Sequence, residues 1–321
     1  MSLKVKYWGV RGSLPTAPSP QEWVQHILKL NEGCESIADL RSALESMPVV
    51  SVGGYGTATT CVEVQSSKQR IIIDGGSGLR ALSEQIMSCK VGSDKGPFHI
   101  FMTHFHWDHI IGLPFFTPHF IPGAQIHYYA VQKNIEEAIK GVFKKPYFPV
   151  PFGALSSKVH FHVLQPRKAI QINDLTITPY QLDHPDECWG FKIQNDGKTY
   201  AHCVDTEGTR FTREDLQQDL PLYQNVDLMY FDAQYTFPEL AEKANWGHSA
   251  SQIGLDIAFR EGIKKVLFAH HDPGASLHQI ENLIKQTQEF YDWRKQSAID
   301  NKENFNDVDW SFAHEGFEID L

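Results

Sequence analysis

The segment from Thr103 to His109, T-H-F-H-W-D-H, constrains this chain most, because it gathers three imidazoles and a carboxylate directly after the apolar run HIFM. That run predicts a buried strand. Where a strand ends, residues i and i+2 project to the same side, so His104 and His106 present two imidazoles to one point. Asp108 and His109 follow as the chain turns and can address a second point close by. Two neutral nitrogens and a carboxylate suit a borderline divalent ion such as Zn²⁺, with Mn²⁺ and Fe as alternatives that ligand type alone does not exclude.

These four residues do not complete two metal coordination shells, so the hypothesis requires further His or Asp residues at other strand ends. The sequence supplies them, since His184 follows the run LTITPY, Asp205 follows TYAHCV and His270 follows KKVLF. Each precedes a turn-forming stretch, as a ligand at the rim of a sheet should. Alone, each would more often be a structural or solvated residue. Together with H-x-H-x-D-H they predict a metal centre.

Strand-like runs alternate with helical patterns in the first and last thirds of the chain, which indicates an α/β protein. In the middle, the runs KVHFHVL, LTITPYQL, WGFKIQ and TYAHCV succeed one another without helices, so at least one sheet is mixed or antiparallel. The 321 residues contain no linker, repeat or composition break. We therefore expect one domain over residues 1–321.

Residues 15 to 50 form an insertion between two early strands. It begins with the Pro/Ser-rich run PTAPSP and continues as two short helical patterns. The apolar positions of these patterns are Trp23, Ile27 and Leu30, then Ile37, Leu40 and Leu44. The insertion either packs as ordinary surface structure or covers a cleft as a lid, since long insertions are often functional. A contact between two copies in a homodimer is a third reading, and the sequence does not choose among them.

Charge and composition argue against several kinds of partner, although a local basic groove stays open. Lys and Arg total 29 against 39 Asp and Glu, a formal net charge of −10, which opposes a broad phosphate-gripping face for nucleic acid or anionic lipid. The first residues, MSLKVKYWGVRGS, lack the apolar stretch of a signal peptide, and no run approaches a membrane span. Five scattered cysteines without a C-x-x-C pair argue against a disulfide framework or a cysteine zinc site. We therefore expect a cytoplasmic protein.

Taken together, these motifs resemble the metallo-β-lactamase superfamily over nearly the whole chain and in the expected order. The resemblance implies a four-layered αβ/βα sandwich, with two mixed sheets flanked by helices and two divalent metal ions at one edge. It assigns the first ion to His104, His106 and His184, and the second to Asp108, His109 and His270. It also implies that Asp205 bridges both ions and that Asp74, in IIIDGGSG, orders the ligand loop without binding metal.

Such a metal pair implies a mechanism. Two ions about 3.5–4 Å apart hold a bridging water and lower its pKa toward 7, which gives hydroxide as the nucleophile at neutral pH. Asp108 can both bind metal and accept a hydrogen bond from that nucleophile. The ions also offset charge that develops on the attacked centre. The chain is therefore expected to be a binuclear metal-dependent hydrolase.

The run WGHSASQIGLDIAFREG narrows the reaction class. Ser249, followed three residues later by Gln252, resembles a capping box that opens a helix. His248 would then stand just before a helix N-terminus, where amide groups and the helix dipole favour an anion. A protonatable imidazole there fits phosphate-ester cleavage, whereas the alternative is an ordinary surface histidine. This segment resembles the phosphodiesterase branch of the superfamily, which includes tRNase Z and cyclic-nucleotide phosphodiesterase-like proteins.

Three further residues are candidates around the centre. Arg11, on the loop after the first strand, could clamp phosphate oxygens bidentately, although a surface salt bridge is nearly as well supported. Trp107 could stack on a base, although aromatic residues in loops more often plug a core. Asp232, in YFDAQY, is expected to orient a ligand histidine from behind.

Our first hypothesis is a two-metal phosphodiesterase that acts on a small or nucleotide-like phosphodiester. The alternatives are a tRNA 3′-processing endonuclease, which the acidic charge and the absence of a basic arm oppose, and a thioester, lactone or β-lactam hydrolase, which leaves His248 without a task. A further alternative, which is not an enzyme of this kind, is a non-hydrolytic metal-binding sensor. The ligand set resembles hydrolases more than carboxylate-richer di-iron proteins, which opposes this reading.

Overall fold

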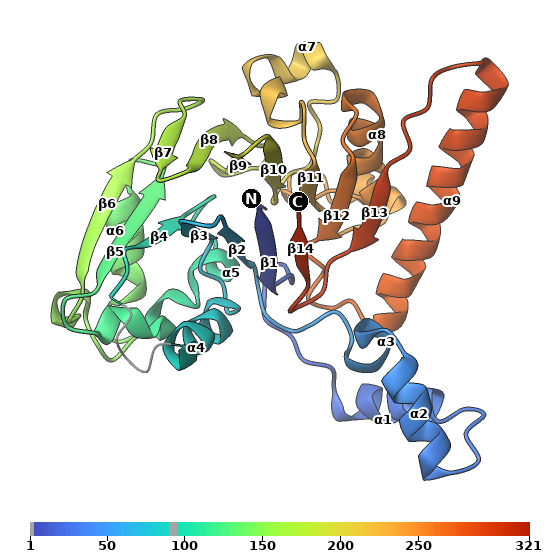
Figure 1. Cartoon of the computed structure of the whole chain (residues 1–321), viewed down its shortest axis with the longest axis horizontal. Helices are drawn as coiled ribbons and strands as arrows, with labels where there is room; N and C mark the ends of the chain where they lie inside the picture. Colours follow the sequence, from blue (N-terminus) through green and yellow to red (C-terminus); the bar gives the residue numbers. More distant parts are fainter. Residues whose placement is uncertain (1–2, 90–94) are drawn as a thin grey trace.

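Two seven-stranded sheets lie face to face in the computed structural model, which describes residues 3–89 and 95–321 (Figure 1). The first sheet has the order β14-β1-β2-β3-β4-β5-β6. Its strands β3 to β6 run parallel, and the pairs of β1 with β14, β1 with β2 and β2 with β3 are antiparallel. The bounds are β1 Lys4–Gly9, β2 Cys61–Gln65, β3 Arg70–Ile73, β4 Phe98–Phe101, β5 Gln125–Ala130, β6 Lys158–Val163 and β14 Glu318–Asp320.

The second sheet has the order β13-β12-β11-β10-β9-β8-β7. Strands β10 to β13 are parallel, and β7 to β10 pair in antiparallel fashion. The bounds are β7 Ile170–Ile172, β8 Leu175–Gln181, β9 Trp189–Asn195, β10 Lys198–Cys203, β11 Leu228–Asp232, β12 Lys265–Ala269 and β13 Asp309–Phe312. Both sheets are mixed, which confirms the expectation drawn from strand runs without intervening helices.

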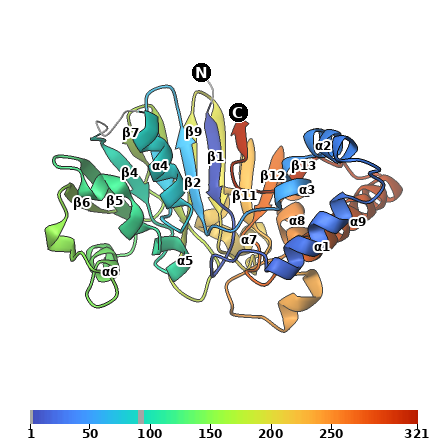
Figure 2. The ribbon, with the colours of Figure 1, turned by 90° about the horizontal axis from the view of Figure 1, so that it is seen from below.

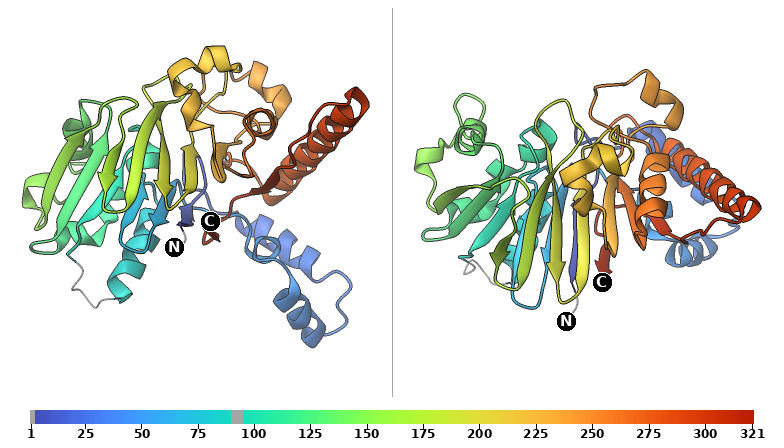
Figure 3. Two further views of the ribbon diagram at one scale, coloured as in Figure 1. Left: turned by 45° about the horizontal axis from the view of Figure 1, so that its top comes forward. Right: turned by 90° about the horizontal axis from the view of Figure 1, so that it is seen from above.

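Helices cover the outer faces of both sheets (Figures 1 and 3). The helix bounds are α1 Pro20–Leu30, α2 Ile37–Ser46, α3 Val49–Gly53, α4 Leu79–Cys89, α5 Trp107–Ile110, α6 Ile135–Val142, α7 Arg213–Leu216, α8 Ser251–Glu261 and α9 Leu277–Asn301. Short 3₁₀ turns lie at Leu113–Phe115, Thr117–Phe120, Phe152–Ala154, Gln217–Leu222 and Phe237–Ala241. In the described part of the chain, no helix is both long and apolar enough to cross a membrane.

Three apolar clusters account for the layering. One fills the space between the sheets and includes Tyr7, Phe191 and Tyr230. A second packs α8 and α9 onto the second sheet, and a third packs α4 and α6 onto the first. Burial of apolar side chains on both faces of each sheet is the main stabilising contribution to such a sandwich. The predicted four-layered αβ/βα sandwich is therefore confirmed.

The insertion between β1 and β2 forms α1, α2 and α3, which extend from the body beside the start of α9 (Figure 1). The two predicted helices are present, whereas α3 was not expected. None of the three helices has a buried residue. Lys29 of α1 pairs with Glu281 of α9 at 3.4 Å. The apolar stripes of α1 and α2 are therefore not buried, and the surface, lid and dimer readings all stay predictions.

Strand ends explain where a site can form. The carboxyl ends of β3 and β4 in the first sheet and of β10, β11 and β12 in the second lead into the segments that carry the candidate residues. Because parallel strands end at the same edge of a sheet, side chains from segments far apart in the sequence meet there. Figure 2 shows α5, which carries Asp108 and His109, close to this edge between the two halves of the molecule.

Candidate metal centre

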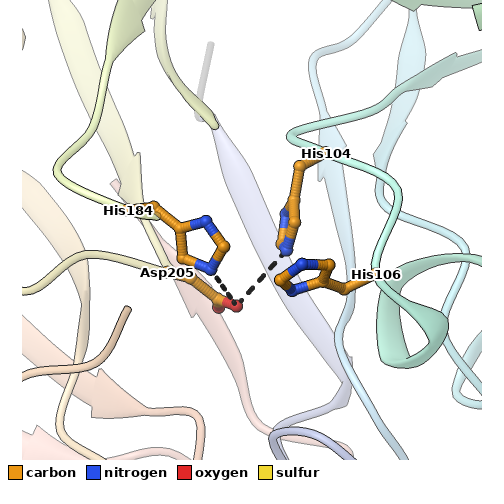
Figure 4. Close-up of side chains that lie close together, drawn as sticks. All are labelled: His104, His106, His184 and Asp205. Carbon is orange, nitrogen blue, oxygen red and sulfur yellow. Dashed lines mark ion pairs between the residues drawn. The ribbon is translucent and has the colours of Figure 1, made fainter. Parts of the chain in front are cut away.

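The first group of convergent side chains contains His104, His106, His184 and Asp205 (Figure 4). Each offers one ligand atom, and these four atoms lie within 4.8 Å of one another. Nε2 of His104 is 3.6 Å and Nε2 of His184 is 4.0 Å from Oδ2 of Asp205. Three imidazoles and one carboxylate are a donor set that suits a divalent ion of the zinc type.

A second group contains Asp108, His109, His270 and again Asp205, all buried. Nε2 of His109 lies 3.3 Å from Oδ2 of Asp108 and 3.3 Å from Oδ2 of Asp205. Nε2 of His270 lies 3.1 Å from Oδ2 of Asp108 and 2.9 Å from Oδ1 of Asp205. The backbone of His270 has φ 62°, a left-handed conformation that is uncommon outside glycine and that concentrates at functional sites. Asp205 thus belongs to both groups.

Unpartnered atoms test whether these groups fit metal ions. Within residues 3–89 and 95–321, the buried Nε2 atoms of His104, His109 and His184 make no hydrogen bond. A buried polar atom without a hydrogen bond costs about 1–3 kcal/mol, so a cluster of three at one point requires an explanation. Coordination of divalent ions by these lone pairs supplies it, and the residues present fit the implied pair of metals.

The far nitrogens of the same imidazoles are held in place. Nδ1 of His109 lies 2.8 Å from Asp74, which also accepts hydrogen bonds from the backbone and the hydroxyl of Thr103. Nδ1 of His270 lies 2.9 Å from Oε1 of Gln234, and Nδ1 of His184 lies 3.0 Å from the carbonyl of Asp186. Such acceptors fix the ring so that Nε2 faces inward. Asp74 thus contacts the ligand loop in the manner that the resemblance implied.

Charges inside the groups shift their pKa values strongly. Burial would raise the pKa of the Asp205 carboxyl, but the imidazoles of His270 and His109 hold it well below its usual range. Burial would lower the pKa of His109, but the carboxylates of Asp108 and Asp205 raise it well above its usual value. His104 behaves differently, because burial, followed by the neighbouring His109, lowers its pKa. A centre that holds carboxylates ionised in a buried place is suited to cations.

His106 is the exposed member of the first group. Its Nε2 lies 2.7 Å from Oδ2 of Asp186, and both side chains face solvent. This contact ties the ligand loop after β4 to the loop after β8. Asp186 was not among the predicted residues, although it stands two positions after His184 in QLDHPDE.

His248 completes a third group with Asp205, Asp232 and His270, again within 4.8 Å. Its Nδ1 lies 2.9 Å from Oδ2 of Asp232, which also accepts a hydrogen bond from the backbone N–H of Ser249. Asp232 was expected to orient a ligand histidine, but its nearer imidazole is that of His248, since Nδ1 of His270 is 3.6 Å away. His248 thus lies beside both predicted metal groups.

The predicted capping box at Ser249 and Gln252 is wrong. Helix α8 begins at Ser251, its N-cap is Ala250, and no side chain caps it. The reason is that the helix begins two residues later than expected, so Ser249 lies before the N-cap position, and its hydroxyl donates to the carbonyl of Glu207. His248 is therefore held by Asp232 and not by a capped helix end. Its neighbour Gly247 packs closely on the His184 ring, where a Cβ would lie 2.3 Å away.

Arg11 is only 4% exposed, so the predicted surface salt bridge is wrong. Its guanidinium donates to the carbonyls of Gly56, Asp272 and Ala275 at 2.9 to 3.0 Å. Nε and Nη1 are thereby engaged with backbone carbonyls, and a contact between Arg11 and substrate stays a prediction. Trp107 lies between His106 and Asp108 and is 63% exposed, so it does not plug a core.

Sequence reasoning missed several residues that shape the site. The backbone N–H of Ser13 donates to Oδ2 of Asp108 at 2.8 Å. Gly12 allows this approach, because a Cβ there would lie 2.4 Å from Nδ1 of His270. Gln234, which contacts His270, stands in the run YFDAQY and carried no metal-ligand signal of its own. These are contacts between distant segments, which local patterns do not report.

A salt-bridge network anchors the His184 loop from outside. Arg210 donates to the carboxylates of Asp183 and Asp219, and Arg167 donates to Asp219 through two nitrogens. The backbone N–H of Glu207 also donates to the carbonyl of Asp183 at 2.7 Å. The segments that follow β8 and β10 are thereby joined beside the centre.

A family model described as a beta-lactamase superfamily domain matches residues 69–271, which is more than half of the chain. The chain therefore belongs to the beta-lactamase superfamily, and the predicted membership is confirmed. The matching family and the ribonuclease relatives support an assignment as a hydrolase of the metallo-β-lactamase fold.

Two relatives have names that describe an activity. Ribonuclease BN of Cronobacter sakazakii (strain ATCC BAA-894) is 23% identical over 239 residues, which cover 60% of this chain and 76% of that protein. Ribonuclease Z of Staphylococcus carnosus (strain TM300) is 26% identical over 277 residues, which cover 75% of this chain and 82% of that protein. They weigh against the expectation that nucleic acid is not a partner.

The fold also matches a solved structure along its whole length. The metallo-beta-lactamase fold protein YhfI from Bacillus subtilis superimposes with a TM-score of 0.63 at 17% sequence identity, over 100% of both chains. At this identity the likeness concerns the fold.

Proposed function

We propose that this protein is a two-metal phosphodiesterase that hydrolyses a small or nucleotide-like phosphodiester. The observation that carries the proposal is the position of Asp205. It belongs to both groups of metal-ligand candidates and to the third group that contains His248. A shared carboxylate suits a bridge between two ions, and the adjacent imidazole suits a proton donor for a leaving group.

The chain's own residues would divide the work. Two divalent ions, when bound, would polarise the phosphate and lower the pKa of a water molecule. Asp108, fixed by the N–H of Ser13 and by His270, is the carboxylate placed to orient that water. Asp232 holds Nδ1 of His248 and so leaves Nε2 as the atom that can give a proton to the departing oxygen.

A leaving-group series tests the role of His248. Metal-loaded protein should hydrolyse bis-p-nitrophenyl phosphate, whose leaving group departs without a proton. On a diester with a poor leaving group, His248→Ala should lower kcat by about 10² to 10⁴, while p-nitrophenolate release changes little. His278→Gln, an exposed position on α9, is the matched control and should change neither rate. An unchanged rate for His248→Ala on the poor leaving group would remove this role.

A second candidate is cleavage of RNA near a tRNA 3′ end, which the two ribonuclease relatives favour. The net charge of −10 opposes a strong grip on the RNA body. The helical insertion offers little help, because between residues 15 and 53 five acidic residues stand against Lys29 and Arg41. Binding and cleavage of a tRNA precursor at low salt, beside a dinucleotide diester at equal concentration, separates the two candidates.

A further inference from the structure

The tripeptide H-F-H occurs twice in this chain, and the metal centre uses only the first copy. The second is His160-Phe161-His162, in the middle of β6. In the register of the parallel strands, His160 faces His127 of β5, and His127 in turn faces His99 of β4. Four imidazoles therefore lie across three neighbouring strands, away from the ligand loops.

These imidazoles share one face of the sheet. Phe161 packs against the cluster that joins the first sheet to α4 and α6, and Ile126 belongs to the same cluster. Because side chains alternate along a strand, His127, His160 and His162 project to the opposite face. Strand β6 is the edge of its sheet, at the side of the molecule away from α9 (Figures 1 and 2). His160 is exposed, and His127 and His162 are half-buried.

The rings are close to one another. Nδ1 of His127 lies 2.9 Å from Nε2 of His162. The ring centroids of His127 and His160 are 4.6 Å apart, and those of His127 and His162 are 5.2 Å apart. Nε2 of His160 currently lies 3.1 Å from Oε1 of Gln125. Binding of one ion by all three residues would require His160 to rotate away from Gln125, so that its Nε2 faces the nitrogens of His127 and His162.

The cluster resists protonation. Burial, and then the neighbouring imidazoles, lower the pKa of His99 to about 4 and also lower the pKa values of His127 and His162. Neutral imidazoles keep their lone pairs, and a metal must find its ligands deprotonated. An uncharged set of nitrogens is therefore available near pH 7.

We propose that His127, His160 and His162 form a second metal site, which binds one divalent transition-metal ion of the Cu²⁺, Ni²⁺ or Zn²⁺ class. Imidazole ligands without carboxylates suit these ions. Metal–nitrogen bonds of about 2.0–2.1 Å at a tetrahedral angle place two nitrogens about 3.3 Å apart. The His127 and His162 nitrogens therefore need to separate by only a few tenths of an ångström. The bound ion would join the edge strand β6 to β5.

Copper binding to protein whose main centre is already filled with Zn²⁺ tests the site. We expect one equivalent of Cu²⁺ to bind without release of zinc, with an electron paramagnetic resonance spectrum of several nitrogen ligands. Copper should also raise the Tm, because a ligand that binds only the folded state stabilises it. The double variant His127→Gln and His162→Gln should lose this equivalent, its spectrum and the Tm increase.

Two further variants keep the outcome decisive. His160→Gln alters an exposed side chain that the core does not need, so the variant should fold normally and lose one nitrogen from the copper spectrum. His278→Gln should behave as the unaltered protein. Copper that enters only by displacing zinc, or a copper spectrum in His160→Gln or in the double variant that is the same as in the unaltered protein, would overturn the proposal.

Discussion

The two H-F-H tripeptides have the same composition but different places in the fold, and the difference decides what each can hold. His104 and His106 stand just beyond the end of β4, where Asp205 and His184 arrive from the facing sheet. His160 and His162 stand inside β6, where their neighbours come from β5 of the same sheet. A strand end can collect residues from both sheets, whereas a mid-strand position can collect only what the register supplies.

This difference sets charge as well as geometry. The first tripeptide shares its group with Asp205, and Asp108 lies in the adjoining group. These two carboxylates can offset the charge of two cations. The second meets imidazole and the phenol of Tyr129. Carboxylate and imidazole together suit a hydrolytic pair of metals, and imidazole alone suits a single borderline ion. Four changes test the contrast, in order of decreasing effect.

The largest effect is expected for Asp205→Ala. Because Asp205 belongs to both groups at the strand ends, its loss should abolish retention of the metal pair and lower diesterase activity by several orders of magnitude. Elemental analysis and the bis-p-nitrophenyl phosphate rate measure this. Copper binding at the second tripeptide should be unchanged, and Asp309→Asn, at an exposed carboxylate, is the control. A variant that keeps two ions would contradict the assignment.

A smaller effect is expected for Asp74→Asn. The neutral amide keeps the size of the side chain but removes the negative charge beside Nδ1 of His109. Loss of such a supporting carboxylate typically weakens metal affinity by about 10- to 100-fold. Titration against a metal buffer measures it, with the copper spectrum of the second site as an internal reference. Equal affinity in both proteins would mean that Asp74 does not support the centre.

The histidine cluster around the second tripeptide, which includes His99 of β4, should make stability depend on pH. His99 has a pKa of about 4 in the folded chain against an ordinary 6.5. Between these values the unfolded chain binds a proton that the folded chain does not, so the free energy of unfolding falls as pH is lowered through this window. His99→Gln should flatten that slope without removing it, because buried His119 acts in the same direction. Urea unfolding of the metal-free proteins at several pH values measures this. An equal pH dependence of the free energy of unfolding in His99→Gln and the unaltered protein would contradict the role of His99.

The smallest effect is expected for Asp186→Asn. Its contact with Nε2 of His106 is short, but both side chains face solvent. Exposed pairs contribute about 0.2–1 kcal/mol, which corresponds to less than about a fivefold change in metal affinity. The same metal-buffer titration measures it. A loss of metal affinity as large as that of Asp74→Asn would contradict the expectation that an exposed contact supports the metal centre less than a buried one does.

Local patterns predicted much of the fold. Apolar runs without intervening helices predicted the strands β6, β8, β9 and β10. The local patterns missed β7 and β13, because each is a short strand that is defined by its pairing with β8 or β12. The predicted capping box failed because α8 begins at Ser251, so that Ser249 lies before the N-cap position, where its hydroxyl donates to Glu207, a partner 42 positions away.

Local sequence patterns were enough to identify the candidate ligands, because the H-x-H-x-D-H run, His184, Asp205 and His270 each follow an apolar run. The folded chain was needed to show that Asp205 is shared, that Arg11 is buried against carbonyls and that His127 meets His162. Periodicity reports only which side chains point the same way along one strand. Which strands become neighbours depends on how the two apolar sheets and their helices pack, and that is a property of the whole chain.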